Sequence, residues 1–105
     1  MLPNLELVEA ALNYLAESDA DHATLYGRKD AFKEKIKLLK ARAFLNADGT
    51  VGPREAPADC DPEVEKAIND SEHCLVDFKL IENKRSRALT TIDVWRSVSA
   101  NQRRS

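Results

Sequence analysis

The sequence predicts an all-α protein: a short N-terminal helix followed by a long antiparallel helical hairpin of coiled-coil type, which we expect to assemble as a homo-oligomer. Of its 105 residues, 43% are apolar and 32% are charged, a balance that suits amphipathic helices. Three Gly and four Pro leave long stretches without a helix breaker. Within those stretches, apolar residues recur at steps of three and four. Because a short chain buries little surface by itself, we expect further copies to cover the rest of the apolar stripe.

The first 46 residues predict two helices, over residues 4–17 and 19–46. Asn4 is a suitable N-cap for the first helix, whose apolar stripe consists of Leu5, Val8, Leu12 and Leu15. Ser18, with Asp21 three residues later, offers a second start. The second stripe consists of Leu25, Phe32, Ile36, Leu39 and Ala43. At about 100° per residue the two stripes are out of phase, so we expect a break near residues 18–21.

Gly27 lies within the second predicted helix, where glycine costs about 1 kcal/mol relative to alanine. A glycine at such a position indicates either close approach of another helix or a point where the helix bends easily. The first explanation is favoured, so Gly27 is a predicted packing position.

A loop over residues 47–60 and one helix over residues 62–99 complete the single predicted domain. The loop contains the helix breakers Gly49, Gly52, Pro53 and Pro57. Asp61 and Pro62 suit the N-cap and the first position of the last helix. Its stripe of recurring positions includes Phe78, Ile81, Arg85, Ala88, Ile92 and Trp95. This helix would be roughly 55 Å long at 1.5 Å per residue and would fold back against the preceding one.

Charge is arranged in four blocks along the chain. Residues 1–27 contain five acidic residues and no Lys or Arg; residues 28–47 are mainly basic, 48–77 mainly acidic, and 78–105 mainly basic. An antiparallel hairpin would place residue 35 near residue 72, and would bring the last block to the acidic first helix. Pairing within the fold therefore explains much of the pattern, and an anionic partner is the alternative explanation.

Residues that could support catalysis or hold a metal do not converge in the predicted fold. His22 and His73 lie on different helices, and Cys60, His73 and Cys74 lack the spacing of a zinc site. Cys74 lies on the apolar side and is predicted to be a core thiol. No glycine-rich phosphate-binding loop is present. We therefore expect no enzymatic activity, no cofactor and no metal site.

The candidate binding residues are cationic. Lys33, Lys37 and Lys40 recur at i, i+4 and i+7, a row suited to phosphates, with an ordinary solvated helix face as the alternative. A second candidate set consists of Arg85, Arg87, Arg96, Arg103 and Arg104. Trp95 could stack on unpaired bases, but its place on the stripe favours packing against the first helix or a neighbouring subunit. The other predicted packing residues are Ile92, Phe78, Phe32 and Leu39.

The sequence also predicts the cellular compartment of the protein. No stretch approaches the roughly 18 consecutive apolar residues of a membrane span. The segment "MLPNLELVEA" lacks the basic region and apolar run of a secretory signal. We therefore expect a cytoplasmic protein with reduced thiols and no membrane partner.

The segment "ALTTIDVWRSVSANQRR" resembles the end of small phage-encoded helical proteins, whose last helix finishes in I-x-V-W-R-S followed by A-N-x-R. The segment "KDAFKEKIKLLKARAFL", the loop near "GTVGPRE" and the long last helix share that layout, so the resemblance covers residues 22–104. It assigns no role to the residues it matches, which are Val94, Trp95, Arg96, Ser97, Ala100, Asn101 and Arg103. The Pro-rich "GPREAPADC" departs from the pattern, which has more charge and helix there, and this departure puts any function of the loop in doubt.

In layout these proteins are similar to phage recombination mediators, which help a recombinase to displace single-strand-binding protein from single-stranded DNA. The resemblance implies a non-enzymatic accessory protein of phage recombination or replication in the cytoplasm of the infected bacterium. Its partners would be single-stranded DNA, bound weakly, and a recombinase or single-strand-binding protein. The alternative is a helical protein–protein adaptor or structural oligomer that binds no nucleic acid.

Overall fold

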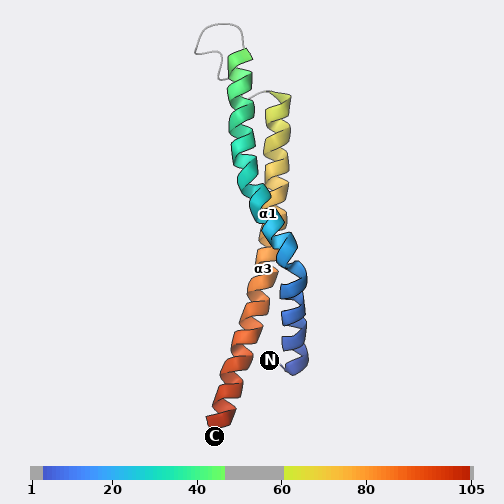
Figure 1. Ribbon diagram of the computed structural model, residues 1–105, viewed down its shortest axis with the longest axis vertical. Coiled ribbons are helices and arrows are strands. Elements are labelled where there is room, and N and C mark those ends of the chain that lie inside the picture. The colour runs from blue at the N-terminus through green and yellow to red at the C-terminus, as the bar shows by residue number, and fades with distance from the viewer. Residues whose placement is uncertain (1–3, 47–60, 105) are drawn as a thin grey trace. The chain divides into compact units, whose positions relative to one another are not determined.

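The computed structural model describes residues 4–46 and 61–104, and these residues form two helices (Figure 1). Helix α1 spans Leu5–Asn46 and helix α3 spans Pro62–Arg104. The predicted all-α class is confirmed for this part of the chain. The predicted loop over residues 47–60 and Cys60 lie outside the described residues. Neither helix contains a segment long and apolar enough to span a lipid bilayer.

Both helices begin at the residues that the sequence indicates. The backbone N–H of Leu7 donates to Oδ1 of Asn4 at 2.9 Å. In α3, the N–H groups of Glu63 and Val64 donate to Oδ1 of Asp61 at 2.8 and 3.3 Å. These side chains satisfy backbone donors that have no partner within the first turn of a helix, so Asn4 and Asp61 are confirmed as N-caps.

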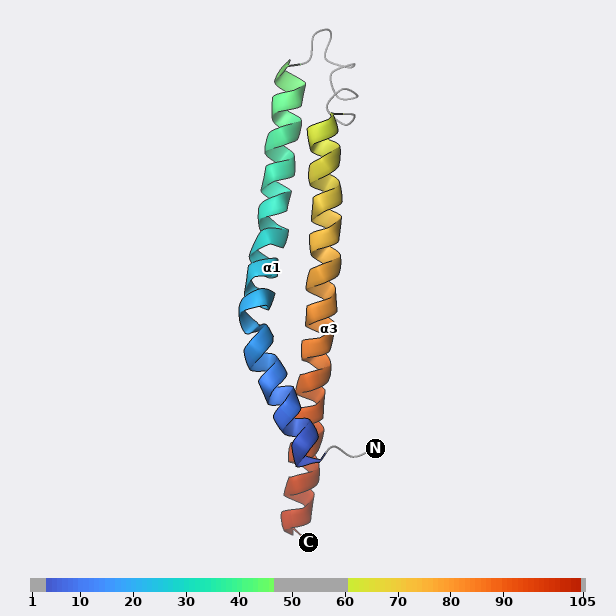
Figure 2. The ribbon, with the colours of Figure 1, turned by 90° about the vertical axis from the view of Figure 1, so that its right-hand side faces the viewer.

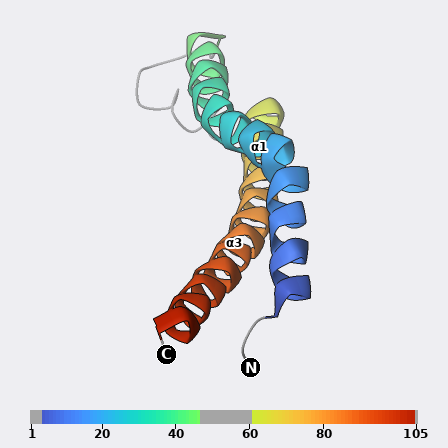
Figure 3. The same cartoon turned by 60° about the horizontal axis from the view of Figure 1, so that its bottom comes forward.

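The chain divides into two compact units, and in each a segment of α1 packs against a segment of α3. Unit 1 consists of Met1–Ala23 with Lys79–Ser105, and unit 2 consists of Thr24–Phe78. Within each unit the two segments run antiparallel and lie side by side (Figures 1 and 2). In unit 1 the beginning of α1 and the end of α3 lie at the same end of the unit (Figure 3). The predicted antiparallel packing of the two long helices is therefore confirmed.

In each segment, a series of less exposed residues recurs at alternating steps of three and four, which is the core spacing of a coiled coil. In unit 1 this series contains Val8, Ala11, Leu15, Ser18 and His22 of α1, and Ile81, Arg85, Ala88, Ile92, Trp95 and Ser99 of α3. In unit 2 it contains Leu25, Lys29, Phe32, Ile36, Leu39 and Ala43 of α1, and Val64, Ala67, Ser71, Cys74 and Phe78 of α3. Several core positions are therefore polar.

Helix α1 continues through residues 18–21, where the sequence predicts a break. Ser18 does not cap a helix there, because its side chain is buried and faces α3. The apolar stripe also differs from the predicted one: Leu5 and Leu12 are exposed, and Ala11 is buried in their place. Helix α3 likewise continues to Arg104, beyond the predicted end near residue 99.

The core of unit 1 is a cluster of Val8, Ala11, Ala88 and Ile92, with Tyr14, Leu15 and Trp95 partly buried against it. Ile92 thus belongs to the core of unit 1, and Trp95 packs against it. In unit 2 the buried residues are Val64, Ala67, Cys74 and Phe78. The predicted packing residues Phe32 and Leu39 are partly buried there. Cys74 is confirmed as a core thiol, with its Sγ 3.8 Å from the carbonyl oxygen of Leu25.

Gly27 is not a packing position: it is exposed, and a Cβ added there would meet no atom within 4 Å. We expect Gly27→Ala to raise the free energy of unfolding by about 0.5–1 kcal/mol, because alanine loses less backbone entropy in a helix. Urea denaturation followed by circular dichroism measures this change. Ala31→Gly, at another exposed position of α1, is the matched control and should lower stability by a similar amount. A loss of stability in Gly27→Ala would contradict the prediction.

Candidate functional site

The row of Lys33, Lys37 and Lys40 lies on α1 in unit 2, and all three residues are exposed. Lys37 pairs with Glu34 in the same helix, with 3.5 Å between Nζ and Oε1. Both side chains of this pair are about three-quarters exposed, so the pair contributes little free energy and can exchange for another anion. Lys33 and Lys37 are therefore accessible to a negatively charged ligand, and Lys40 is exposed beside them.

The arginines predicted to form one binding set in α3 are placed in two different environments. Arg85 points toward α1, and its side chain is 20% exposed. Arg87, Arg96 and Arg103 are exposed, and no carboxylate lies within 4.0 Å of them in the part of the chain that the structure describes. The side chain of Arg104 lies outside the described residues. Arg85 is therefore separate from the exposed arginines that could reach an external anion.

Arg85 connects the two helices of unit 1 through three acceptors on α1. Its Nη1 donates to the carbonyl oxygen of Leu15 at 2.8 Å and to Oγ of Ser18 at 2.9 Å. Its Nη2 lies 3.4 Å from Oδ1 of Asp19. These contacts give the partly buried guanidinium three acceptors and the buried Ser18 hydroxyl a hydrogen-bond partner. The repeating spacing of α3 is the sequence signal that places Arg85 on the core side.

The described ion pairs only partly follow the predicted pairing of charged blocks. The Arg85–Asp19 pair joins α3 to α1 in unit 1. In contrast, the Lys29–Asp30, Lys37–Glu34 and Lys79–Glu82 pairs each join residues of the same helix. Exposed pairs of this kind contribute about 0–1 kcal/mol. Pairing between blocks therefore does not account for exposed cations such as Lys33 and Arg96.

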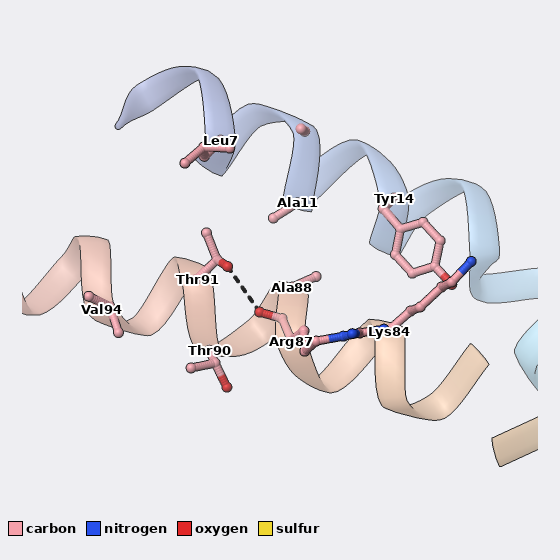
Figure 4. Close-up of a pocket in the computed structure, with 10 residues that line it drawn as sticks. Leu7, Ala11, Tyr14, Lys84, Arg87, Ala88, Thr90, Thr91 and Val94 are labelled. Atoms are coloured by element: carbon pink, nitrogen blue, oxygen red, sulfur yellow. Dashed lines mark hydrogen bonds between the residues drawn. The ribbon is translucent and has the colours of Figure 1, made fainter. Parts of the chain in front are cut away.

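Unit 1 contains an open groove of about 540 Å³ between α1 and α3 (Figure 4). The groove forms because small side chains, Ala11 and Ala88, face each other across the two helices. Leu7 and Val94 flank one end, and Tyr14 and Lys84 flank the other. The lining is completed by Ala10, Arg87, Thr90 and Thr91. The groove is thus mainly apolar, with two cations from α3 at its edge; sequence reasoning did not identify it.

The described residues contain no group of three or more His, Cys, Asp or Glu side chains that could hold a metal ion. A second hollow, of about 380 Å³ in unit 2, is lined in part by Asp70, His73 and Cys74. His73 Nδ1 lies 2.8 Å from the carbonyl oxygen of Asn69 in its own helix, and the Cys74 thiol is buried. These contacts do not align an exposed nucleophile with a base.

No family model matches the sequence, and neither the curated proteins nor the solved structures include a match to it. A function must therefore be inferred from the exposed cations and the groove, together with the resemblance described above.

Proposed function

We propose that this protein is a non-enzymatic accessory factor of phage DNA recombination or replication, which binds single-stranded DNA weakly and helps to load a recombinase. The observation that supports DNA binding is the exposed row of Lys33, Lys37 and Lys40 on α1, together with the exposed Arg96 and Arg103 on α3. The phage setting and the recombinase partner rest on the resemblance of residues 22–104 alone.

The cations suit phosphate contacts in spacing and in chemistry. Along α1, Lys33 lies about 6 Å from Lys37 and Lys37 about 4.5 Å from Lys40 in axial rise, so neighbouring ammonium groups can engage neighbouring phosphates. Arg96 and Arg103 are seven residues apart and therefore share one side of α3. Their guanidinium groups can bind phosphate oxygens in a bidentate manner. Contacts of this kind carry no base specificity and depend strongly on salt concentration.

Base stacking is not part of the proposed interaction. The indole of Trp95, which would be the natural platform, packs against the Val8, Ala11, Ala88 and Ile92 cluster. Without stacking, binding by one chain rests on a few phosphate contacts and is expected to be weak. Several chains on one strand would strengthen binding through effective concentration.

The test is fluorescence anisotropy with a labelled single-stranded oligonucleotide over a series of salt concentrations, beside a duplex of equal length. We expect Lys33→Gln, Lys37→Gln and Lys40→Gln together to weaken binding and to reduce the slope of log K against log salt by about 2, because three phosphate contacts are lost. The matched control combines Lys35→Gln, Lys66→Gln and Lys79→Gln, which removes the same charge from exposed lysines outside the row. Equal effects of the two triple variants, or no binding by the wild type at low salt, would contradict the proposal.

A protein–protein adaptor without nucleic-acid binding is the second candidate function. It is supported by the large apolar side chains that remain exposed on the described helices, such as Leu38 at 69% and Leu45 at 76%. In the anisotropy experiment, absence of binding to both single-stranded and duplex DNA is the outcome expected for an adaptor.

A further inference from the structure

The groove in unit 1 leaves apolar surface exposed on both helices. Leu7 on α1 is 45% exposed and Val94 on α3 is 38% exposed, although both line the groove. Across the described helices, eight apolar side chains are buried while eleven large apolar side chains remain exposed. Of these eleven side chains, Leu7 and Val94 line the groove, where a second pair of helices would cover them.

The charges along the groove are complementary between α1 and α3. On α1, steps of three and four continue from the groove residues Leu7, Ala10 and Tyr14 to the exposed Glu17 and Asp21. On α3, the groove edge carries the exposed Lys84 and Arg87. The α1 side is therefore apolar and acidic, and the α3 side is apolar and basic. A surface with these two halves complements a copy of itself.

We propose that the groove in unit 1 is the contact surface of a homodimer, in which two copies of unit 1 form a four-helix bundle. A two-fold axis parallel to the helices places α1 of each copy across from α3 of the other. A rotation about this axis does not change the position of a residue along it. Leu7 of one copy therefore lies across from Val94 of the other, and Glu17 of one copy lies across from Lys84 of the other. The same contact occurs twice, as a two-fold interface requires.

The area of the contact surface in unit 1 predicts a weak dimer. The α1 segment of unit 1 is about 28 Å long, and two helices side by side are about 20 Å wide, so each copy covers roughly 600 Å². This is near the lower end of specific interfaces, for which about 800 Å² per partner is standard. We therefore expect dissociation in the micromolar range. The inference goes beyond the proposed function and does not depend on DNA binding.

The first test of the interface is sedimentation equilibrium of the full chain over a range of concentrations. We expect Leu7→Ser to raise the dimer Kd by about tenfold or more, because an apolar contact is lost twice in each dimer. Leu38→Ser is the matched control: it changes an exposed leucine of the same helix outside the groove and should leave Kd unchanged. Circular dichroism checks that both variants keep the helical content of the wild type.

The second test separates contacts between copies from contacts within one copy. Glu17→Lys alone and Lys84→Glu alone should each raise the dimer Kd by about tenfold, since like charges then face each other twice. In an equimolar mixture, each lysine of the first variant faces a glutamate of the second, so dimers should re-form between the two variants. A wild type that stays monomeric at every soluble concentration would overturn the proposal, and so would a mixture that remains monomeric. A dimer weakened by Leu38→Ser but not by Leu7→Ser would also overturn it, because the interface would then lie elsewhere.

Discussion

Replacing Phe78 by alanine is expected to lower the free energy of unfolding by about 3–4 kcal/mol. Phe78 is 3% exposed and belongs to the small set of buried side chains in unit 2. Its ring lies edge-on to that of Tyr26, with 5.8 Å between centroids, and Nζ of Lys29 lies 5.6 Å from its centroid. The substitution removes the buried ring together with both contacts. Truncation to alanine leaves a cavity in the core of unit 2.

Chemical denaturation followed by circular dichroism measures the Phe78→Ala effect. Leu80→Ala is the control in the same helix, because Leu80 is 56% exposed and its truncation should change stability by less than about 0.5 kcal/mol. Should Phe78→Ala be unfolded in buffer, Phe78→Leu gives a measurable value near 1 kcal/mol. Similar losses for Phe78→Ala and Leu80→Ala would contradict the assignment of Phe78 to the core.

Replacing Arg85 by alanine is the second large expected effect, a loss of about 2 kcal/mol in the free energy of unfolding. Arg85 donates hydrogen bonds to Leu15 and Ser18 and pairs with Asp19. Hydrogen bonds from a charged group contribute about 1.5–3 kcal/mol, and truncation also leaves the buried Ser18 hydroxyl without this partner. Thermal unfolding should show a decrease in Tm of roughly 8–16 °C for a domain of this size.

A double-mutant cycle attributes this effect to the contact between the helices. We expect Ser18→Ala and Arg85→Ala to be coupled by about 1 kcal/mol, because each removes the partner of the other. Arg87→Ala is the control for loss of charge and of side-chain length, since Arg87 is exposed two residues further along α3. An Arg85→Ala loss no larger than that of Arg87→Ala would show that the inward contacts do not stabilise the fold.

The sequence predicted the helices of this protein better than it predicted their core. Local signals were sufficient for both N-caps, since Asn4 and Asp61 act on their own first turns. The core of α1 was harder to predict because Ser18 and His22 occupy two of its core positions. A stripe defined by apolar residues ends at such positions, although the alternating steps of three and four continue through them.

The candidate site, too, was predicted only where local sequence signals were sufficient. The exposure of Lys33, Lys37 and Lys40 followed from helical periodicity, because a face opposite the core is solvated. The groove could not be predicted in this way. It depends on Ala11 and Ala88 meeting across two helices, and that meeting is set by the register between segments far apart in the sequence. The spacing of α3 places Arg85 on the core side, but its hydrogen-bond partners likewise depend on which α1 residues stand opposite it.

The contact between Arg85 and Ser18 also gives the two helices of unit 1 one preferred alignment. A seven-residue repeat presents nearly the same apolar surface after a slide of seven residues, so apolar packing alone leaves several alignments close in energy. Such a slide would bring Arg85 to Ala11 or Leu25 in place of Ser18, and neither side chain can accept a hydrogen bond. A partly buried guanidinium that loses the Ser18 acceptor costs about 1–3 kcal/mol. One arginine thus selects a single alignment, as the turn does in a β-hairpin.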